Sequence, residues 1–173
     1  MRLPAKSLRA ALALALLSLT LPAAATTFEV EAGRSYSNSY GTNAAFVEGV
    51  FDAQPIGSSL FSWEPDVSLG WLDGRDLYEH HIEGKNTREN AFLAGAGARF
   101  QYGQHGDWYR HLFFSFQPTY NTGRTPGLSG PLEFASTFGW QGKHFSLQLR
   151  HISNAGLHEP NRGETMALAG LSF

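Results

Sequence analysis

The sequence contains no cysteine among its 173 residues. This absence excludes a disulfide scaffold, a thiolate metal site and a cysteine nucleophile. Charge is also scarce, because Asp, Glu, Lys and Arg make up 16% of the chain and the formal net charge is −2. No basic cluster is interleaved with aromatic residues, so we expect no nucleic-acid partner. The 13 Phe, 6 Tyr and 4 Trp exclude a disordered chain.

The first 25 residues differ from the rest. Three basic residues precede a short apolar run, which ends in small residues at positions 22–25. This order is typical of a secretory signal peptide, and we expect cleavage after Ala25. Residues 26–173 would then form a single domain. No later stretch reaches 18 consecutive apolar residues, so the sequence does not predict a transmembrane helix there.

Apolar and polar residues alternate with a period of two through most of the remaining chain, which indicates β-strands. Gly, Asn, Asp and Pro separate the alternating segments. Connections near 53–58, 103–107 and 141–143 are short, and those near 37–43, 72–90, 121–130 and 154–163 are longer. The pattern predicts an all-β fold, an eight-stranded antiparallel transmembrane β-barrel of the bacterial outer membrane. The eight predicted strands lie near residues 28–33, 44–52, 61–71, 91–102, 108–117, 132–140, 145–153 and 165–173.

Alternation does not show which face of a strand points inward. A soluble barrel that carries a lipid inside is therefore an alternative fold. The terminal Phe173 resembles the C-terminal sorting signal of outer-membrane barrels, which favours the membrane interpretation. In that interpretation the charged strand residues form an ionic plug inside the barrel, namely Glu29, Glu31, Glu48, Glu64, Asp66, Arg99 and Arg150.

Two polar residues continue an apolar stripe at the end of the seventh predicted strand. His151 and Ser153 keep the two-residue period of Phe145, Leu147 and Leu149, so they project to the same side, about 7 Å apart at Cα. This spacing suits a serine nucleophile and a histidine base. Unpaired polar groups facing hydrocarbon cost about 1–3 kcal/mol, which suggests a function. Taken alone, a His-x-Ser pair is a weak motif, and headgroup contacts or the start of a loop are the more common explanation.

The topology of the predicted barrel indicates where in the membrane His151 and Ser153 lie. With both chain ends on the periplasmic side, the seventh strand ascends, and its last residues lie in the outer leaflet, where lipopolysaccharide is the lipid. We therefore expect hydrolysis of a lipid A ester at the interface, with outer-membrane lipid around the barrel. The sequence predicts no cofactor and no metal, and His80 and His81 are expected to lie in a solvated loop. A homodimer is left open.

The segment His151-Ile152-Ser153-Asn154-Ala155-Gly156-Leu157, followed by Pro160-Asn161 and Gly163, resembles the lipid A 3-O-deacylase (PagL) family. The resemblance is sharp over roughly residues 150–173 and architectural elsewhere. It implies an outer-membrane barrel that removes the ester-linked 3-hydroxyacyl chain at position 3 of lipid A. By matching positions, Ser153 is the nucleophile, His151 is the base, and the oxyanion binds near Asn154 and Gly156.

The acid of the catalytic triad departs from the family pattern. In the family the acid follows the loop glycine by two positions, whereas here Glu164 follows Gly163 directly and Thr165 takes that place. We predict Glu164 as the acid, although uninterrupted alternation would turn it inward and a bulge would be needed to aim it at His151. Glu159 and a dyad without an acid are the alternatives. A non-catalytic barrel with a structural or surface-binding role is the competing function.

Overall fold

The structure is a computed structural model that describes residues 27–37, 40–74, 90–123, 125, 127–159 and 161–173. The predicted signal peptide and the His80-His81 loop lie outside these residues. Within the described residues, no helix is long and apolar enough to cross a bilayer.

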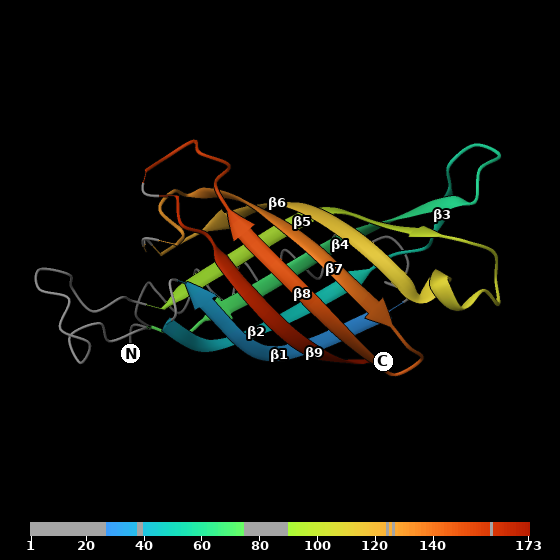
Figure 1. Cartoon of the computed structure of the whole chain (residues 1–173), viewed down its shortest axis with the longest axis horizontal. Coiled ribbons are helices and arrows are strands. Elements are labelled where there is room, and N and C mark those ends of the chain that lie inside the picture. Colours follow the sequence, from blue (N-terminus) through green and yellow to red (C-terminus); the bar gives the residue numbers. More distant parts are fainter. Residues whose placement is uncertain (1–26, 38–39, 75–89, 124, 126, 160) are drawn as a thin grey trace, which may run out of the picture.

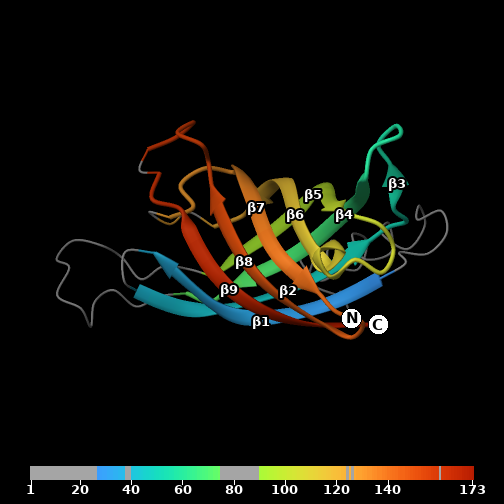
Figure 2. The ribbon, with the colours of Figure 1, turned by 45° about the vertical axis from the view of Figure 1, so that its right-hand side comes forward.

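Eight long antiparallel strands form one closed barrel, as predicted (Figure 1). The barrel closes because β1 pairs with both β2 and β9, and because β2 pairs with β4. The two-residue β3 (Gln54–Pro55) pairs with β4 and projects beyond the barrel wall (Figure 2). The long strands are β1 (Thr27–Ser37), β2 (Tyr40–Val50), β4 (Phe61–Leu72), β5 (Ala91–Tyr102), β6 (Leu112–Asn121), β7 (Leu132–Gln141), β8 (Phe145–Ser153) and β9 (Glu164–Ser172).

Two predicted boundaries are wrong. The fifth strand begins at Leu112 rather than near Trp108, because residues Trp108–His111 form the 3₁₀ turn η2. The expected long connection near 37–43 is limited to residues 38–39, since β1 and β2 stay paired as far as Ser37 and Tyr40. Strand pairing therefore continues through residues that the sequence placed in a loop.

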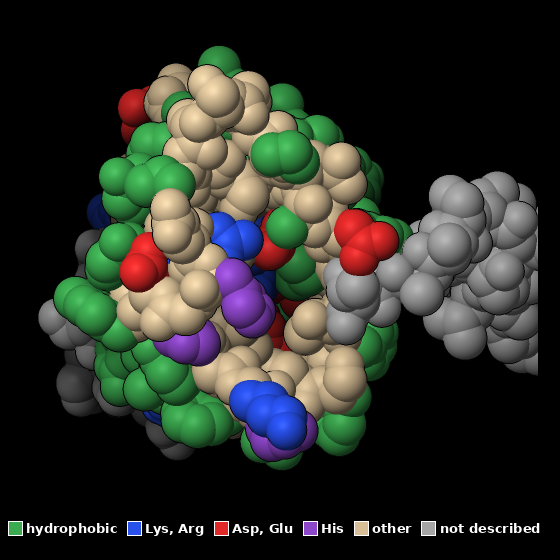
Figure 3. Space-filling view, turned by 90° about the vertical axis from the view of Figure 1, so that its right-hand side faces the viewer, with side chains coloured by type: hydrophobic (Ala, Val, Ile, Leu, Met, Phe, Trp, Pro, Cys, Tyr) green, Lys and Arg blue, Asp and Glu red, His purple; other side chains and the backbone are tan. Residues whose placement is uncertain are grey.

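The barrel interior is polar and its outer surface is apolar. Arg99 bonds Glu48 at 2.8 Å, and Arg150 lies 2.6 Å from Glu48 and 3.2 Å from Glu31. Hydrophobic side chains surround the end of the barrel that carries β3, while charged groups are visible in its hollow (Figure 3). This arrangement confirms the predicted ionic plug. It also excludes the alternative of a soluble lipid-carrying barrel, whose apolar face would point inward.

The rings of Phe46 and Phe113 share the interior with these arginines. The Phe113 ring lies 3.9 Å from the Arg99 guanidinium carbon and occupies the space that a side chain at Gly139 would fill. Residues 113 and 139 are cross-strand partners of β6 and β7. Phe113 disturbs the alternation in the sequence because it packs inside the barrel, 2% exposed, between two outward-facing neighbours.

Candidate active site

His151 and Ser153 lie on the outer face of β8, at the barrel end opposite the C-terminus. The apolar stripe before them is exposed, with Leu147 at 58% and Leu149 at 56%, and the intervening residues point inward. His151 is exposed and Ser153 is half-buried beside the 154–163 connection. The structure therefore places both side chains on the side that the alternation predicts.

Thr165 holds the imidazole from the neighbouring strand. His151 and Thr165 are register partners of β8 and β9, and His151 Nδ1 lies 2.9 Å from Thr165 Oγ1 in a hydrogen bond. If the imidazole donates from Nδ1, its Nε2 carries the free electron pair. A general base that accepts a serine proton uses such a pair.

Gly163 gives the imidazole its space. Gly163 has φ +67°, and a Cβ built on it would lie 2.6 Å from His151 Cε1 and 3.0 Å from Nε2. Continuing the β8–β9 register by one residue places Gly163 opposite Ser153. The Nε2 edge therefore faces the end of β8 where Ser153 lies. Within the part of the chain that the structure describes, Ser153 Oγ makes no hydrogen bond, so His151 and Ser153 are on one face but not bonded to each other.

Glu164 does not orient His151, contrary to the prediction. Its side chain is 1% exposed and points into the barrel, where Oε2 accepts a hydrogen bond of 2.7 Å from Ser35 Oγ. The alternation of β9 runs without a bulge from its first residue, which puts Glu164 inward and Thr165 outward. The alternative acid, Glu159, is exposed in the loop, where Oε2 accepts the N–H of Asn161 at 3.3 Å.

The predicted oxyanion donors are engaged within the 154–163 connection. The Asn154 N–H donates to Asn161 Oδ1 at 3.2 Å, and the Gly156 N–H donates to Asn154 Oδ1 at 2.9 Å. The Asn154 side chain is fully buried and donates to Ser129 Oγ and the His158 carbonyl, both at 2.7 Å. An oxyanion at either N–H would have to replace a present partner. The roles of Asn161 and Ser129 in this loop were not visible in the sequence.

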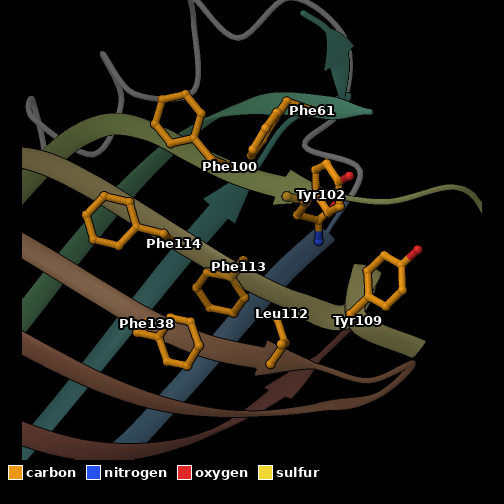
Figure 4. Close-up of a pocket in the computed structure, with 9 residues that line it drawn as sticks. Phe61, Phe100, Tyr102, Tyr109, Leu112, Phe113, Phe114 and Phe138 are labelled. Atoms are coloured by element: carbon orange, nitrogen blue, oxygen red, sulfur yellow. The ribbon is translucent and has the colours of Figure 1, made fainter. Parts of the chain in front are cut away.

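An aromatic groove at the other end of the barrel is a separate feature (Figure 4). It has a volume of about 490 Å³ and contains no histidine or carboxylate in its lining. Aromatic side chains near the ends of the strands are typical of the aromatic girdle of an outer-membrane barrel. The residues that line the groove are Phe61, Phe100, Gln101, Tyr102, Tyr109, Leu112, Phe113, Phe114 and Phe138.

A comparison with models of known protein families shows to which family the chain is related. The sequence model of the family described as lipid A 3-O-deacylase (PagL) matches residues 53–173. The chain belongs to this family. The matched region includes β8, the 154–163 connection and β9, so every residue of the candidate site lies inside it. A search among curated proteins found no match.

Three solved structures were compared with this PagL family member, and the crystal structure of PagL shares its fold. The crystal structure of the outer-membrane enzyme PagL covers 86% of this chain and 99% of its own, with 16% identity and a TM-score of 0.55. The crystal structure of Ail, the attachment invasion locus protein of Yersinia pestis, covers 85% and 98%, with 9% identity and a TM-score of 0.42. The backbone structure of Ail in a bilayer nanodisc gives 85% and 99%, 10% identity and a TM-score of 0.47.

Family and surface together place the protein in the bacterial outer membrane. A closed barrel pairs its backbone groups internally, which a lipid environment requires. The outward residues of the strands are apolar over most of the barrel, and the charged residues of the described strands other than Arg34 lie inside. This distribution is that of a transmembrane barrel of the PagL family.

Proposed function

We propose that the protein hydrolyses the ester at position 3 of lipid A, with Ser153 as nucleophile and His151 as general base. The observation that carries this proposal is the outward-facing hydroxyl and imidazole at one end of β8, with His151 Nδ1 bonded to Thr165. A substrate in the outer leaflet would meet these groups without leaving the membrane. The family to which the chain belongs supports the substrate class.

The reaction would proceed in two steps. Ser153 Oγ attacks the ester carbonyl carbon while its proton passes to His151 Nε2. The bond to the sugar oxygen then breaks, and the imidazolium returns the proton to that oxygen. Water, activated by the same imidazole, attacks the acyl-serine and releases a 3-hydroxy fatty acid. Ser153 recovers its proton at the end of this step.

Thr165 is the orienting residue in this proposal, in place of an acid. Its hydroxyl oxygen accepts the Nδ1–H of His151 and so fixes the tautomer that leaves Nε2 free. A hydroxyl carries no charge, so it stabilises the imidazolium less than a carboxylate would. The site would therefore work with an orienting group but without a charged one.

The oxyanion would bind at the N–H of Asn154. This donor comes directly after the nucleophile in the chain, and Asn161 Oδ1 now accepts its hydrogen bond. The developing oxyanion would take the place of that amide oxygen, because a charged acceptor binds an N–H more strongly than a neutral one. Rotation of the Asn161 side chain would make room for it.

The test is mass spectrometry of lipid A from cells that express the protein. We expect loss of one 3-hydroxyacyl chain with the wild type, and unmodified lipid A with Ser153→Ala or His151→Ala. Lys143→Gln, in the turn at the other end of β8, serves as a matched control and should leave the modification intact. If cells that contain the well-folded wild-type barrel still hold only fully acylated lipid A, the proposed activity is refuted.

A non-catalytic barrel is the second candidate. The neutral Thr165 beside His151 favours it, since an inactive relative can lose its acid without losing its fold. Under this hypothesis Ser153→Ala and the wild type give the same lipid A profile. Any 3-hydroxy fatty acid whose release depends on Ser153 excludes it.

A further inference from the structure

Arg34 is a charged side chain on the outer face of β1. Glu29, Glu31 and Ser35 of this strand point inward and are buried, whereas Arg34 and Tyr36 point outward and are exposed. In the part of the eight long strands that the structure describes, Arg34 is the only outward-facing residue among Lys, Arg, Asp and Glu. A guanidinium in contact with lipid is costly unless an anion or an interface accepts it, so this position calls for a partner.

The guanidinium extends along the barrel wall toward the loop end of β1. Its Nη1 donates to Asn43 Oδ1 at 2.7 Å, and a Cβ on Gly41 would lie 2.9 Å from its Nη2. Gly41 is the register partner of Tyr36, two residues beyond Arg34 toward that end. The charged group therefore lies beside the row of paired residues that contains Tyr36.

The same row contains the candidate catalytic histidine. Tyr36 pairs with Thr165 on β9, and Thr165 pairs with His151 on β8. With neighbouring strands about 4.8 Å apart, the guanidinium between β1 and β2 is about 10–15 Å from His151 across the outer surface. This separation is comparable to the span of a phosphorylated disaccharide headgroup.

Within the residues that the structure describes, Arg34 has donors left for a ligand. Its described polar contact is Asn43, whose Nδ2 in turn donates to Asp73 Oδ2 at 3.4 Å. Within the described residues no carboxylate forms an ion pair with Arg34. The planar fork of a guanidinium matches the oxygens of a phosphate better than any other side chain does.

We propose that Arg34 binds a phosphate of the lipid A disaccharide while the ester of the same molecule lies at Ser153. This assignment rests on the proposed function. Arg34 is then a substrate-binding residue that fixes how the headgroup lies across β8, β9 and β1.

The test measures binding of two lipids to the full-length barrel in detergent micelles. In the Ser153→Ala background, adding Arg34→Gln should weaken binding of diphosphorylated lipid A about tenfold, the size of one lost charge-assisted contact. Binding of phosphate-free lipid A should not change, and Lys143→Gln should affect neither lipid. Equal losses for both lipids would overturn the proposal, because they indicate a damaged surface. Displacement of lipid A by millimolar inorganic phosphate would overturn the assignment to a lipid headgroup.

Kinetics with an intact Ser153 separate this inference from the proposed function. Arg34→Gln should raise KM for diphosphorylated lipid A with little change in kcat. An unchanged KM would overturn the role of Arg34 in substrate binding, since a binding effect would then come from a neighbouring lipid, and the esterase would stand. If the wild type releases no fatty acid but the binding difference persists, the proposed function fails and the phosphate site is supported.

Discussion

At the scale of single residues, the orienting partner of His151 decides how strong a base the imidazole is. Thr165 fixes the ring through Nδ1 at 2.9 Å but offers no negative charge. In the serine protease triad, replacing the aspartate by its amide lowers kcat by about 10⁴, because the tautomer becomes wrong. A threonine hydroxyl can still accept from Nδ1–H, so it preserves the tautomer and gives up only the charge.

Substitutions at residue 165 test this role. Thr165→Val keeps the shape but removes the hydroxyl, and we expect kcat to fall about tenfold, which equals about 1.4 kcal/mol. Thr165→Glu supplies a carboxylate and should raise kcat by a similar factor. Its activity should be lost at a higher pH on the acid side, because the stabilised imidazolium keeps its proton and cannot act as a base. The measurement is the pH profile of fatty-acid release. A valine variant as active as the wild type would contradict the orienting role.

Gly163 provides a second prediction at this scale. An added Cβ would lie 2.6 Å from His151 Cε1, and the φ of +67° disfavours other residues. Gly163→Ala should therefore displace the imidazole and lower kcat about tenfold or more. Gly57→Ala is a control for the backbone effect alone, because Gly57 has φ +60° and nothing within 4 Å of its built Cβ. If both variants keep full activity, Gly163 does not position the histidine.

At the scale of elements, strand pairs fit because a large residue faces a glycine. Phe113 of β6 covers Gly139 of β7, and Phe46 of β2 covers Gly70 of β4. Each ring also lies against an interior arginine, with the Phe46 ring 4.4 Å from the Arg150 guanidinium carbon. The glycines are therefore part of the packing of the barrel interior.

Gly139→Val tests this packing. The valine would occupy the space of the Phe113 ring and push it from Arg99, which should lower the free energy of unfolding by about 1–3 kcal/mol. Ala96→Val adds a branched side chain on the outer face of β5 and should have little effect. Urea unfolding in micelles, followed by tryptophan fluorescence, gives both values. Equal stability of the two variants would contradict the packing argument.

At the scale of the whole molecule, the interior charges join strands from all sides of the barrel. Glu48 of β2 binds Arg99 of β5 and Arg150 of β8, and Arg150 also contacts Glu31 of β1. These groups are almost fully buried, so the interactions of each charge with its partners must compensate for its lost hydration. The network therefore links strands that are distant in the sequence.

Arg150→Leu tests the network as a unit. The change leaves the buried Glu31 without its cation and Glu48 with Arg99 alone, and it should lower the free energy of unfolding by about 3–5 kcal/mol. Adding Glu31→Gln removes the uncompensated charge and should recover part of the loss. The shift of gel mobility between heated and unheated samples, followed across temperature, reports the melting of the barrel. Additive losses in the double variant would show that the residues do not interact.

Much of this protein follows from alternation along the chain. Period-two patterning indicated the long strands, the outward faces of His151 and Ser153, and the charged interior, because neighbouring residues of a strand must point to opposite sides. It failed where a fit across strands prevails over the local pattern, as at Phe113 inside the barrel. The same alternation put Glu164 inward, and the expected bulge is absent.

What the pattern along the chain could not reveal is which residues of different strands meet. Three contacts depend on register and loop closure. They are the contact of Thr165 with His151, the place of the Arg34 guanidinium beside the row that contains His151, and the engagement of the Asn154 N–H by Asn161. Register comes from pairing between segments that are far apart in the sequence, and a shift of one residue would turn every side chain to the other face. The sequence alone thus determined which residues face outward, whereas closure of the barrel determined which residues of other strands they contact.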